Sequence, residues 1–89
     1  MRIRWTEGAD GNLDQVEEYI AQDNPPAAVA TVNKIIDSAQ MLADYPTIGK
    51  RERGTRELVV AGLPYIVIYA VQREELVILR VLHTSMKYP

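Results

Sequence analysis

Two apolar stripes with helical spacing lie on either side of Asn24-Pro25-Pro26, and they constrain the fold more than any other feature of the sequence. Members of the first stripe, four, three and four positions apart, are Ala9, Leu13, Val16 and Ile20. Members of the second, four, three, four and three positions apart, are Ala28, Val32, Ile35, Ala39 and Leu42. Residues at such spacing share one face of an α-helix. Because the connection between the stripes is short, the two helices are predicted to pack as an antiparallel hairpin.

Local signals mark the ends of these helices. Thr6 is placed to cap the first helix, and Asn24 to cap the second. Pro25 then occupies the first helical position, where its missing N–H costs no hydrogen bond. Because Pro46 disfavours helical geometry in the residue before it, the second helix is predicted to end there.

The hydrophobic period changes in the second half of the chain. Runs rich in Val, Ile, Leu and Tyr alternate with turn-forming segments, a pattern typical of strands joined by hairpins. The predicted strands are Met1–Trp5, Glu57–Val60, Tyr65–Val71 and Leu76–Leu82. The predicted turns lie at Ala61-Gly62 and Gln72–Glu75, and residues 45–55 are interpreted as a polar loop. The order β-α-α-β-β-β predicts a single α+β domain over residues 1–89, with the helical hairpin on one face of a mainly antiparallel four-stranded sheet.

The composition excludes several kinds of site. The chain has no cysteine, which excludes disulfides, thiolate nucleophiles and zinc–sulfur sites. Its single histidine has no nucleophile or acid pattern around it, so neither a catalytic triad, a metal site nor a cofactor is expected. The N-terminus lacks a signal-peptide pattern, and no apolar run approaches the roughly 20 residues of a membrane span. A cytoplasmic protein without membrane contact is therefore expected.

Charge is distributed unevenly along the chain. Residues 1–44 contain three basic and eight acidic residues, whereas residues 45–89 contain seven basic and four acidic ones. The C-terminal half is the better candidate for contact with an acidic partner, although an ordinary mixed surface has the same composition. The basic cluster Lys50, Arg51, Arg53 and Arg56 is either a contact surface for a protein or DNA phosphates, or a solvated loop.

An arginine, a histidine and two tyrosines of the predicted sheet each have two possible roles. Arg80 lies inside an apolar strand, so it is either paired, with Glu57 as a candidate, or exposed on a functional face. His83 either makes structural hydrogen bonds at a strand end or belongs to a binding surface. Tyr65 and Tyr69 share one face of their strand, as core residues with hydrogen-bonded hydroxyls or as contact residues.

Several segments occur in an order and at spacings typical of one family. They are Trp5 to Ala9, Asn24-Pro25, Tyr45-Pro46-Thr47-Ile48-Gly49-Lys50, Thr55-Arg56-Glu57-Leu58-Val59-Val60, and Ile78-Leu79-Arg80-Val81-Leu82-His83. Together they resemble the ParE/RelE superfamily of bacterial type II toxin–antitoxin toxins, and most closely its ParE branch. The resemblance runs from about residue 5 to the last proline.

The superfamily divides by mechanism. RelE-like members cut messenger RNA on the ribosome with Lys and Arg side chains, which stabilise the charge on phosphorus. An alignment anchored on Pro64-Tyr65 places Glu57, Val59, Ile66 and Met86 where a catalytic relative carries cations. The resemblance therefore implies a ParE-like toxin that is not an enzyme, that inhibits DNA gyrase by protein–protein contact, and that a cognate ParD-like antitoxin neutralises in a hetero-oligomer.

Two alternatives follow from the altered C-terminal tail. One is a RelE-like, ribosome-dependent messenger RNA endoribonuclease that uses Lys87, Tyr88 and the loop arginines. The other is a degenerate, non-toxic homologue that only binds its antitoxin.

The resemblance also yields candidate contact residues. Those for the target are Lys50, Arg51, Arg53, Arg56, Arg80, His83, Lys87 and Tyr88. Antitoxins of the family bind as extended or helical segments along the helical hairpin and the sheet. Candidates for that contact are Leu13, Val16, Ile20, Val32, Ile35, Tyr65 and Tyr69.

Overall fold

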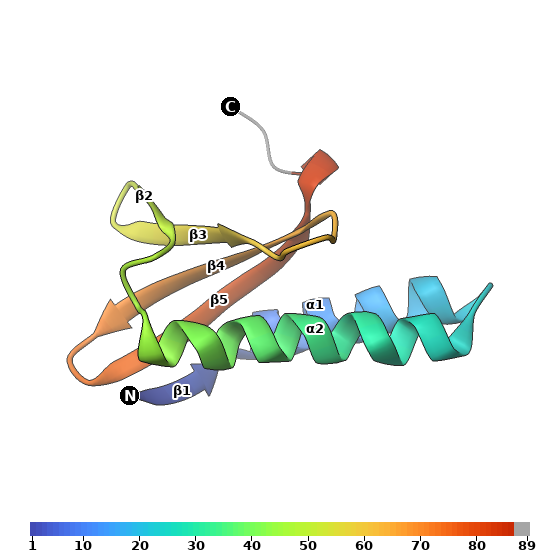
Figure 1. The fold of residues 1–89 in the computed structure, drawn as a ribbon, viewed down its shortest axis with the longest axis horizontal. Coiled ribbons are helices and arrows are strands. Elements are labelled where there is room, and N and C mark those ends of the chain that lie inside the picture. Colours follow the sequence, from blue (N-terminus) through green and yellow to red (C-terminus); the bar gives the residue numbers. More distant parts are fainter. Residues whose placement is uncertain (87–89) are drawn as a thin grey trace.

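Within residues 1–86 the chain forms two α-helices and five strands, one strand more than the sequence predicts (Figure 1). The structure is a computed structural model and describes residues 1–86. In chain order the elements are β1 (Arg2–Trp5), α1 (Glu7–Ala21), α2 (Pro25–Asp44), β2 (Lys50–Glu52), β3 (Thr55–Val59), β4 (Tyr65–Gln72), β5 (Glu75–His83) and a short 3₁₀ helix, η1 (Thr84–Met86).

One sheet contains all five strands, in the order β1-β5-β4-β3-β2. β1 is parallel to β5, and the other neighbouring pairs are antiparallel. The α+β class and the mainly antiparallel sheet are therefore confirmed, while the expected count of four strands is corrected to five.

The additional strand, β2, lies in the segment interpreted as a polar loop. It pairs with β3 so that Glu52 faces Thr55 across a two-residue turn at Arg53-Gly54. Both turn residues have positive φ, 47° for Arg53 and 85° for Gly54. Such turns favour Asn-Gly or Asp-Gly. Because an arginine occupies the first turn position, the sequence lacks the pattern that predicts such a hairpin.

Side-chain caps begin both helices as predicted. The hydroxyl of Thr6 accepts a hydrogen bond from the N–H of Ala9 at 3.1 Å. The side-chain oxygen of Asn24 accepts one from the N–H of Ala27, also at 3.1 Å. The stripe residues then turn inwards, because each helix must cover its apolar face.

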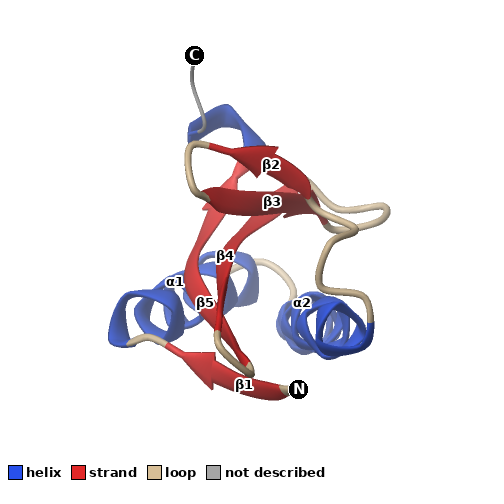
Figure 2. Cartoon of the chain, turned by 90° about the vertical axis from the view of Figure 1, so that its left-hand side faces the viewer, coloured by secondary structure: helices blue, strands red, loops and turns tan. Residues whose placement is uncertain are grey.

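Both helices contribute to one core against the sheet, and Figure 2 shows them viewed nearly end-on beside β4 and β5. The buried stripe residues are Ala9, Val16, Ala28, Ile35, Ala39 and Leu42. From β4 the core takes the alternate side chains Tyr65, Val67 and Tyr69, and from β5 it takes Leu76 and Ile78 and then, after an irregularity in the pairing, Val81. This alternation identifies which face of the two strands meets the helices.

The start of α1 is bonded to β5 where β1 ends. The Thr6 hydroxyl donates to the carbonyl oxygens of Ile78 at 3.0 Å and Leu79 at 3.1 Å. Further along α1, the side-chain oxygen of Asn12 accepts a hydrogen bond from the N–H of Val81 at 3.0 Å. These contacts satisfy edge groups of β5 that have no strand neighbour, and they fix α1 along that edge.

Tyr69 anchors the loop between α2 and β2. Its ring is fully buried, and its hydroxyl donates to the carbonyl of Pro46 at 2.8 Å and accepts from the N–H of Gly49 at 3.0 Å. Arg56 adds two bonds from Nη1, to the carbonyls of Thr47 at 3.1 Å and Gly49 at 2.9 Å. The loop is therefore held by two side chains from the sheet.

We expect Gly49→Ala to lower the free energy of unfolding by about 1–3 kcal/mol, the usual cost of overpacking. A Cβ at Gly49 comes within 2.8 Å of Cε1 of Tyr69 and 2.9 Å of the carbonyl oxygen of Glu57. Urea denaturation measures the change. Gly11→Ala is the matched control, because nothing lies within 4 Å of its Cβ, and in a helix it should stabilise by about 0.5–1 kcal/mol. Equal effects of the two substitutions would contradict the packing argument.

Candidate functional site

A groove of about 440 Å³ lies where α1 passes the end of β5, and we refer to it as the α1–β5 groove. Four elements line it: α1, the first residue of β4, the end of β5, and η1. Its main lining side chains are Val16, Tyr19, Tyr65, Arg80, His83 and Met86. The volume lies in the range of small ligand or side-chain pockets.

The groove has a buried apolar floor and an exposed rim. Val16, Tyr65 and Val81 are 8%, 7% and 3% exposed and also belong to the core. Tyr19 and Met86, on α1 and η1, are 72% and 63% exposed. Apolar side chains that are held out in water beside an apolar floor are typical of a surface that a partner covers.

His83 makes structural hydrogen bonds at a strand end, the first of its two predicted roles, and its ring also lines the groove. Its ring lies edge-on to Tyr65, with ring centroids 5.4 Å apart and an interplanar angle of 86°. The N–H of Ser85 donates to Nδ1 at 3.1 Å, and the Ser85 hydroxyl lies 2.8 Å from the same nitrogen. Because a backbone N–H only donates, Nδ1 accepts and the ring proton is assigned to Nε2. The histidine thus holds η1 in place while it lines the groove.

A bulge decides the position of Arg80. The pairing of β4 with β5 shifts between Ile68 and Tyr69, which face Arg80 and Ile78, so Leu79 is the extra residue. Without the bulge, strict alternation would put Arg80 on the core face with Ile78. With it, Val81 enters the core and Arg80 is exposed.

The predicted pairing of Arg80 with Glu57 is not found. The two side chains share one face of the sheet, but Ile68 of β4 lies between them. Adjacent strands are about 4.8 Å apart, so two strand spacings separate the charges. Among residues 1–86 the structure contains no ion pair that involves Arg80.

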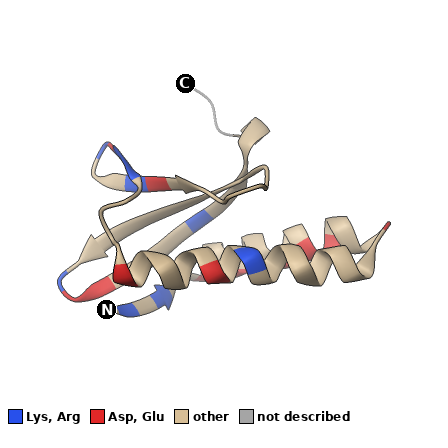
Figure 3. Cartoon of the chain, in the orientation of Figure 1, with Lys and Arg blue, Asp and Glu red and all other residues tan. Residues whose placement is uncertain are grey.

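The four basic residues around β2 and β3 have different roles. Lys50, Arg51 and Arg53 are exposed, whereas Arg56 is half-buried and bonded to loop carbonyls. Figure 3 shows these basic residues at the end of the sheet far from β1. We call Lys50, Arg51 and Arg53 the basic hairpin. The predicted target-binding residues therefore divide between this hairpin and the α1–β5 groove.

The predicted antitoxin-binding residues also divide. Ile35 and Tyr69 are fully buried, so their side chains are enclosed by the core and not available to a partner in this structure. Leu13, Ile20 and Val32 are half-buried, the first two against the same core. Of the seven, Val16 and Tyr65 line the groove. Lys87 and Tyr88, predicted for the target, lie outside the described residues.

Sequence reasoning missed Tyr19, Gln15 and Asn12, which line the groove from α1. A signal for them exists in the sequence. Positions 12, 15 and 19 are three and four apart, a second stripe beside the apolar one. The large aromatic side chain at its end, Tyr19, is 72% exposed.

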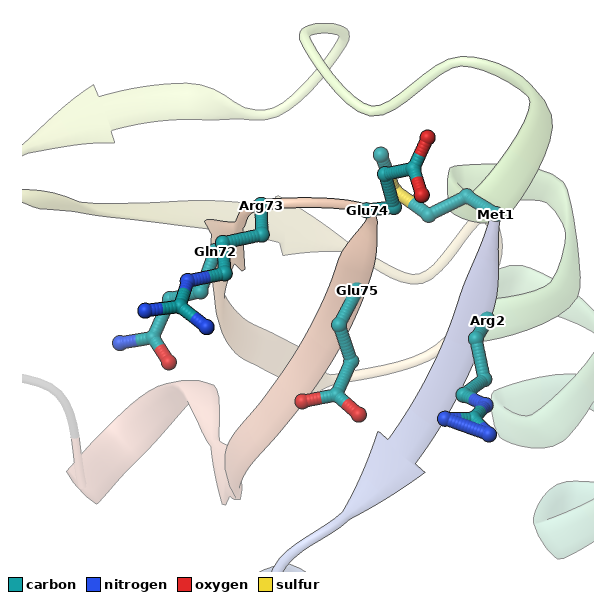
Figure 4. A pocket seen from close by; sticks show the side chains of 6 residues that line it. All are labelled: Met1, Arg2, Gln72, Arg73, Glu74 and Glu75. Carbon is teal, nitrogen blue, oxygen red and sulfur yellow. The ribbon is translucent and has the colours of Figure 1, made fainter.

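A second, larger hollow lies at the start of β1 beside the β4–β5 turn (Figure 4). Its volume is about 960 Å³, and Arg2, Arg73, Glu74 and Glu75 are among the residues that line it. The charges are of both signs, and Glu75 accepts a bond from Nε of Arg4 at 3.0 Å. Mixed, exposed charges of this kind do not select a ligand.

Metal-binding and membrane-spanning features were sought in residues 1–86. Within that range no three His, Cys, Asp or Glu side chains are grouped so that they could hold a metal ion. Neither α1 nor α2 is apolar and long enough to cross a membrane.

Comparison with known proteins gives consistent matches over nearly the whole chain. The family described as "ParE toxin of type II toxin-antitoxin system, parDE" matches residues 3–88. A Sinorhizobium fredii protein named "Putative toxin Y4kP" is 42% identical over 90 residues, covering 99% of this chain and 93% of the relative. Toxin RelE2 of Caulobacter vibrioides is 34% identical over 85 residues, covering 94% and 96%.

One solved structure supports the same relationship. It is described as the chromosomal ParDE TA system from P. aeruginosa, and a chain of it superposes with a TM-score of 0.81 at 25% identity. The match covers 93% of this chain and 95% of that one. Both the fold and its full extent are therefore shared.

We expect the stability of the chain to fall above pH 10 partly through Tyr65. Burial raises the pKa of its hydroxyl above the ordinary value of about 10, and the charge of ionised Tyr19 raises it further. The unfolded chain loses this proton more readily, so the stabilisation is present below pH 10 and disappears as pH rises through the folded-state pKa. Tyrosinate absorbance during an alkaline titration measures the shift.

Tyr65→Phe should reduce the alkaline loss of stability, because it removes the hydroxyl whose pKa is raised. Tyr45→Phe is the control, because Tyr45 is 63% exposed. An equal reduction of the alkaline loss by both substitutions would contradict the assignment.

Proposed function

The chain belongs to the ParE toxin family of type II toxin–antitoxin systems, and on this premise we propose that it inhibits DNA gyrase by protein–protein contact and that a cognate antitoxin neutralises it. The proposal makes the chain a binding protein without an active site of its own. Its target contact is assigned to the basic hairpin.

The observation that carries this proposal is an apolar row on the face of the sheet away from the helices. Val59 of β3 faces Ile66 of β4, and Ile66 faces Leu82 of β5. In the alignment, Val59 and Ile66 stand where a nuclease relative carries cations, and Leu82 lies next to Ile66 on the neighbouring strand. Cleavage of RNA requires cations for the phosphoryl charge and groups that transfer protons. Valine, isoleucine and leucine provide neither, which favours contact over catalysis.

The basic hairpin has the properties of a surface for an acidic partner. Its three cations are exposed on the outermost strand and the adjoining turn, so they reach a flat surface without obstruction. Cations placed in this way steer and orient encounters with acidic protein surfaces or with DNA held by an enzyme. Glu52 in the same strand is half-buried and reduces the positive charge only in part.

Purified protein should inhibit supercoiling by gyrase and cause cleaved DNA to accumulate. Arg51→Glu combined with Arg53→Glu should weaken inhibition about tenfold or more, because close charge pairs across an interface contribute at least that much. Lys34→Glu, an exposed charge reversal on α2, is the matched control and should leave inhibition unchanged. Gyrase that stays fully active at a large molar excess of the wild-type protein would refute the proposal.

The similarity to Toxin RelE2 supports a second candidate, a ribosome-dependent messenger RNA endoribonuclease. A ribosome toeprint assay separates it from the first. We expect no new cleavage products from the wild-type protein. Cleavage that Lys87→Ala abolishes would replace the gyrase proposal with this one.

A further inference from the structure

Two exposed apolar side chains that are distant in sequence line the same groove. Tyr19 comes from α1 and Met86 from η1, and both line the α1–β5 groove. Tyrosine and methionine are enriched where proteins meet, since each covers a large area and adapts to its partner. The rim is therefore suited to an apolar side chain that enters between them.

Contacts within the chain hold the walls of the groove in place. The Ser85–His83 hydrogen bonds hold η1 against the end of β5, and the His83 ring packs edge-on against Tyr65. Val16 and Tyr65 close the floor and are anchored in the core. A site that needs little rearrangement loses less free energy on binding.

The charge of the groove selects a carboxylate. Among the described residues 1–86, no acidic residue lines it, and Arg80 is the only lining residue with a permanent charge. The Arg80 guanidinium has no ion-pair partner among residues 1–86, and a planar guanidinium pairs best with a carboxylate or a phosphate.

The surroundings favour a peptide over a nucleic acid. Binding a phosphate backbone requires several cations in a row, and the described part of the chain contributes one arginine to this groove. The exposed residues Asp14, Glu17 and Glu18 lie on α1 beside Gln15 and Val16 of the lining. These carboxylates repel a polyanion such as a nucleic acid. A peptide with a single carboxylate at Arg80 does not bring further negative charge close to them.

We propose that the α1–β5 groove binds a segment of the antitoxin that presents an apolar side chain next to a carboxylate. The apolar side chain enters between Tyr19 and Met86, and the carboxylate pairs with Arg80. This inference rests on the proposed function, since it specifies the chemistry by which the antitoxin is recognised.

Calorimetric titration of the wild-type protein with its full-length cognate antitoxin tests the inference. Arg80→Glu should weaken binding about tenfold or more, because it replaces an attraction by a repulsion. Tyr19→Ala should weaken it through lost contact area. Both side chains are exposed, so the variants should keep the wild-type melting temperature. Arg73→Glu, a matched reversal at the exposed turn between β4 and β5 and outside the groove, should bind like the wild type.

A charge exchange then identifies the partner group. Each acidic residue of the antitoxin is changed in turn to lysine and titrated against Arg80→Glu. One such antitoxin variant should recover the lost affinity, and the others should not. If none does, the carboxylate pairing is wrong.

The remaining outcomes distinguish this inference from the function on which it rests. Unchanged affinity in both Arg80→Glu and Tyr19→Ala refutes the groove assignment while antitoxin binding itself stands. Absence of binding by the wild-type protein refutes the proposed neutralisation. If a single-stranded RNA oligonucleotide binds the wild type, and the two variants lose that binding but keep the antitoxin, the groove is a nucleic-acid site and the inference is overturned.

Discussion

The extra residue in β5, Leu79, determines which side chains of the last strand face the helices. Before it, Leu76 and Ile78 enter the core, and after it Val81 does so. A regular strand would bury the Arg80 guanidinium without a partner, at a cost of several kcal/mol. The bulge avoids that cost and places the N–H of Val81 where the Asn12 side chain bonds it. The apolar core and the cationic groove therefore have the same origin.

Sequence and structure agree where the determining interactions are local. Helix ends follow from Thr6 and Asn24, since each cap bonds a residue three positions away. Three features depended on tertiary structure. Arg53 adopts a turn geometry that its residue type disfavours, the bulge at Leu79 is fixed by pairing with β4, and the groove combines α1 with η1. The apolar stripes proved to encode burial against the chain's own sheet, which is why Ile35, predicted as a contact, lies in the core.

The roles of the charged residues follow from their hydrogen bonds more than from their clustering. In the sequence, Arg56 belongs with Lys50, Arg51 and Arg53, yet it secures the loop after α2 through two carbonyls. Arg80, which belongs to the same set of predicted target-binding residues, lies instead in a groove lined by apolar, aromatic and uncharged polar side chains. The two positively charged regions, the basic hairpin and the α1–β5 groove, lie on different elements.

The parallel pairing of β1 with β5 has a consequence for the timing of synthesis. Thr6 bonds Leu79, which lies 73 positions later in the chain. Because a ribosome synthesises about 5–20 residues per second, β5 is completed several seconds after β1. The core therefore stays incomplete until β5 leaves the ribosome. Surfaces that combine α1 with β5, the α1–β5 groove included, therefore cannot form until β5 has left the ribosome.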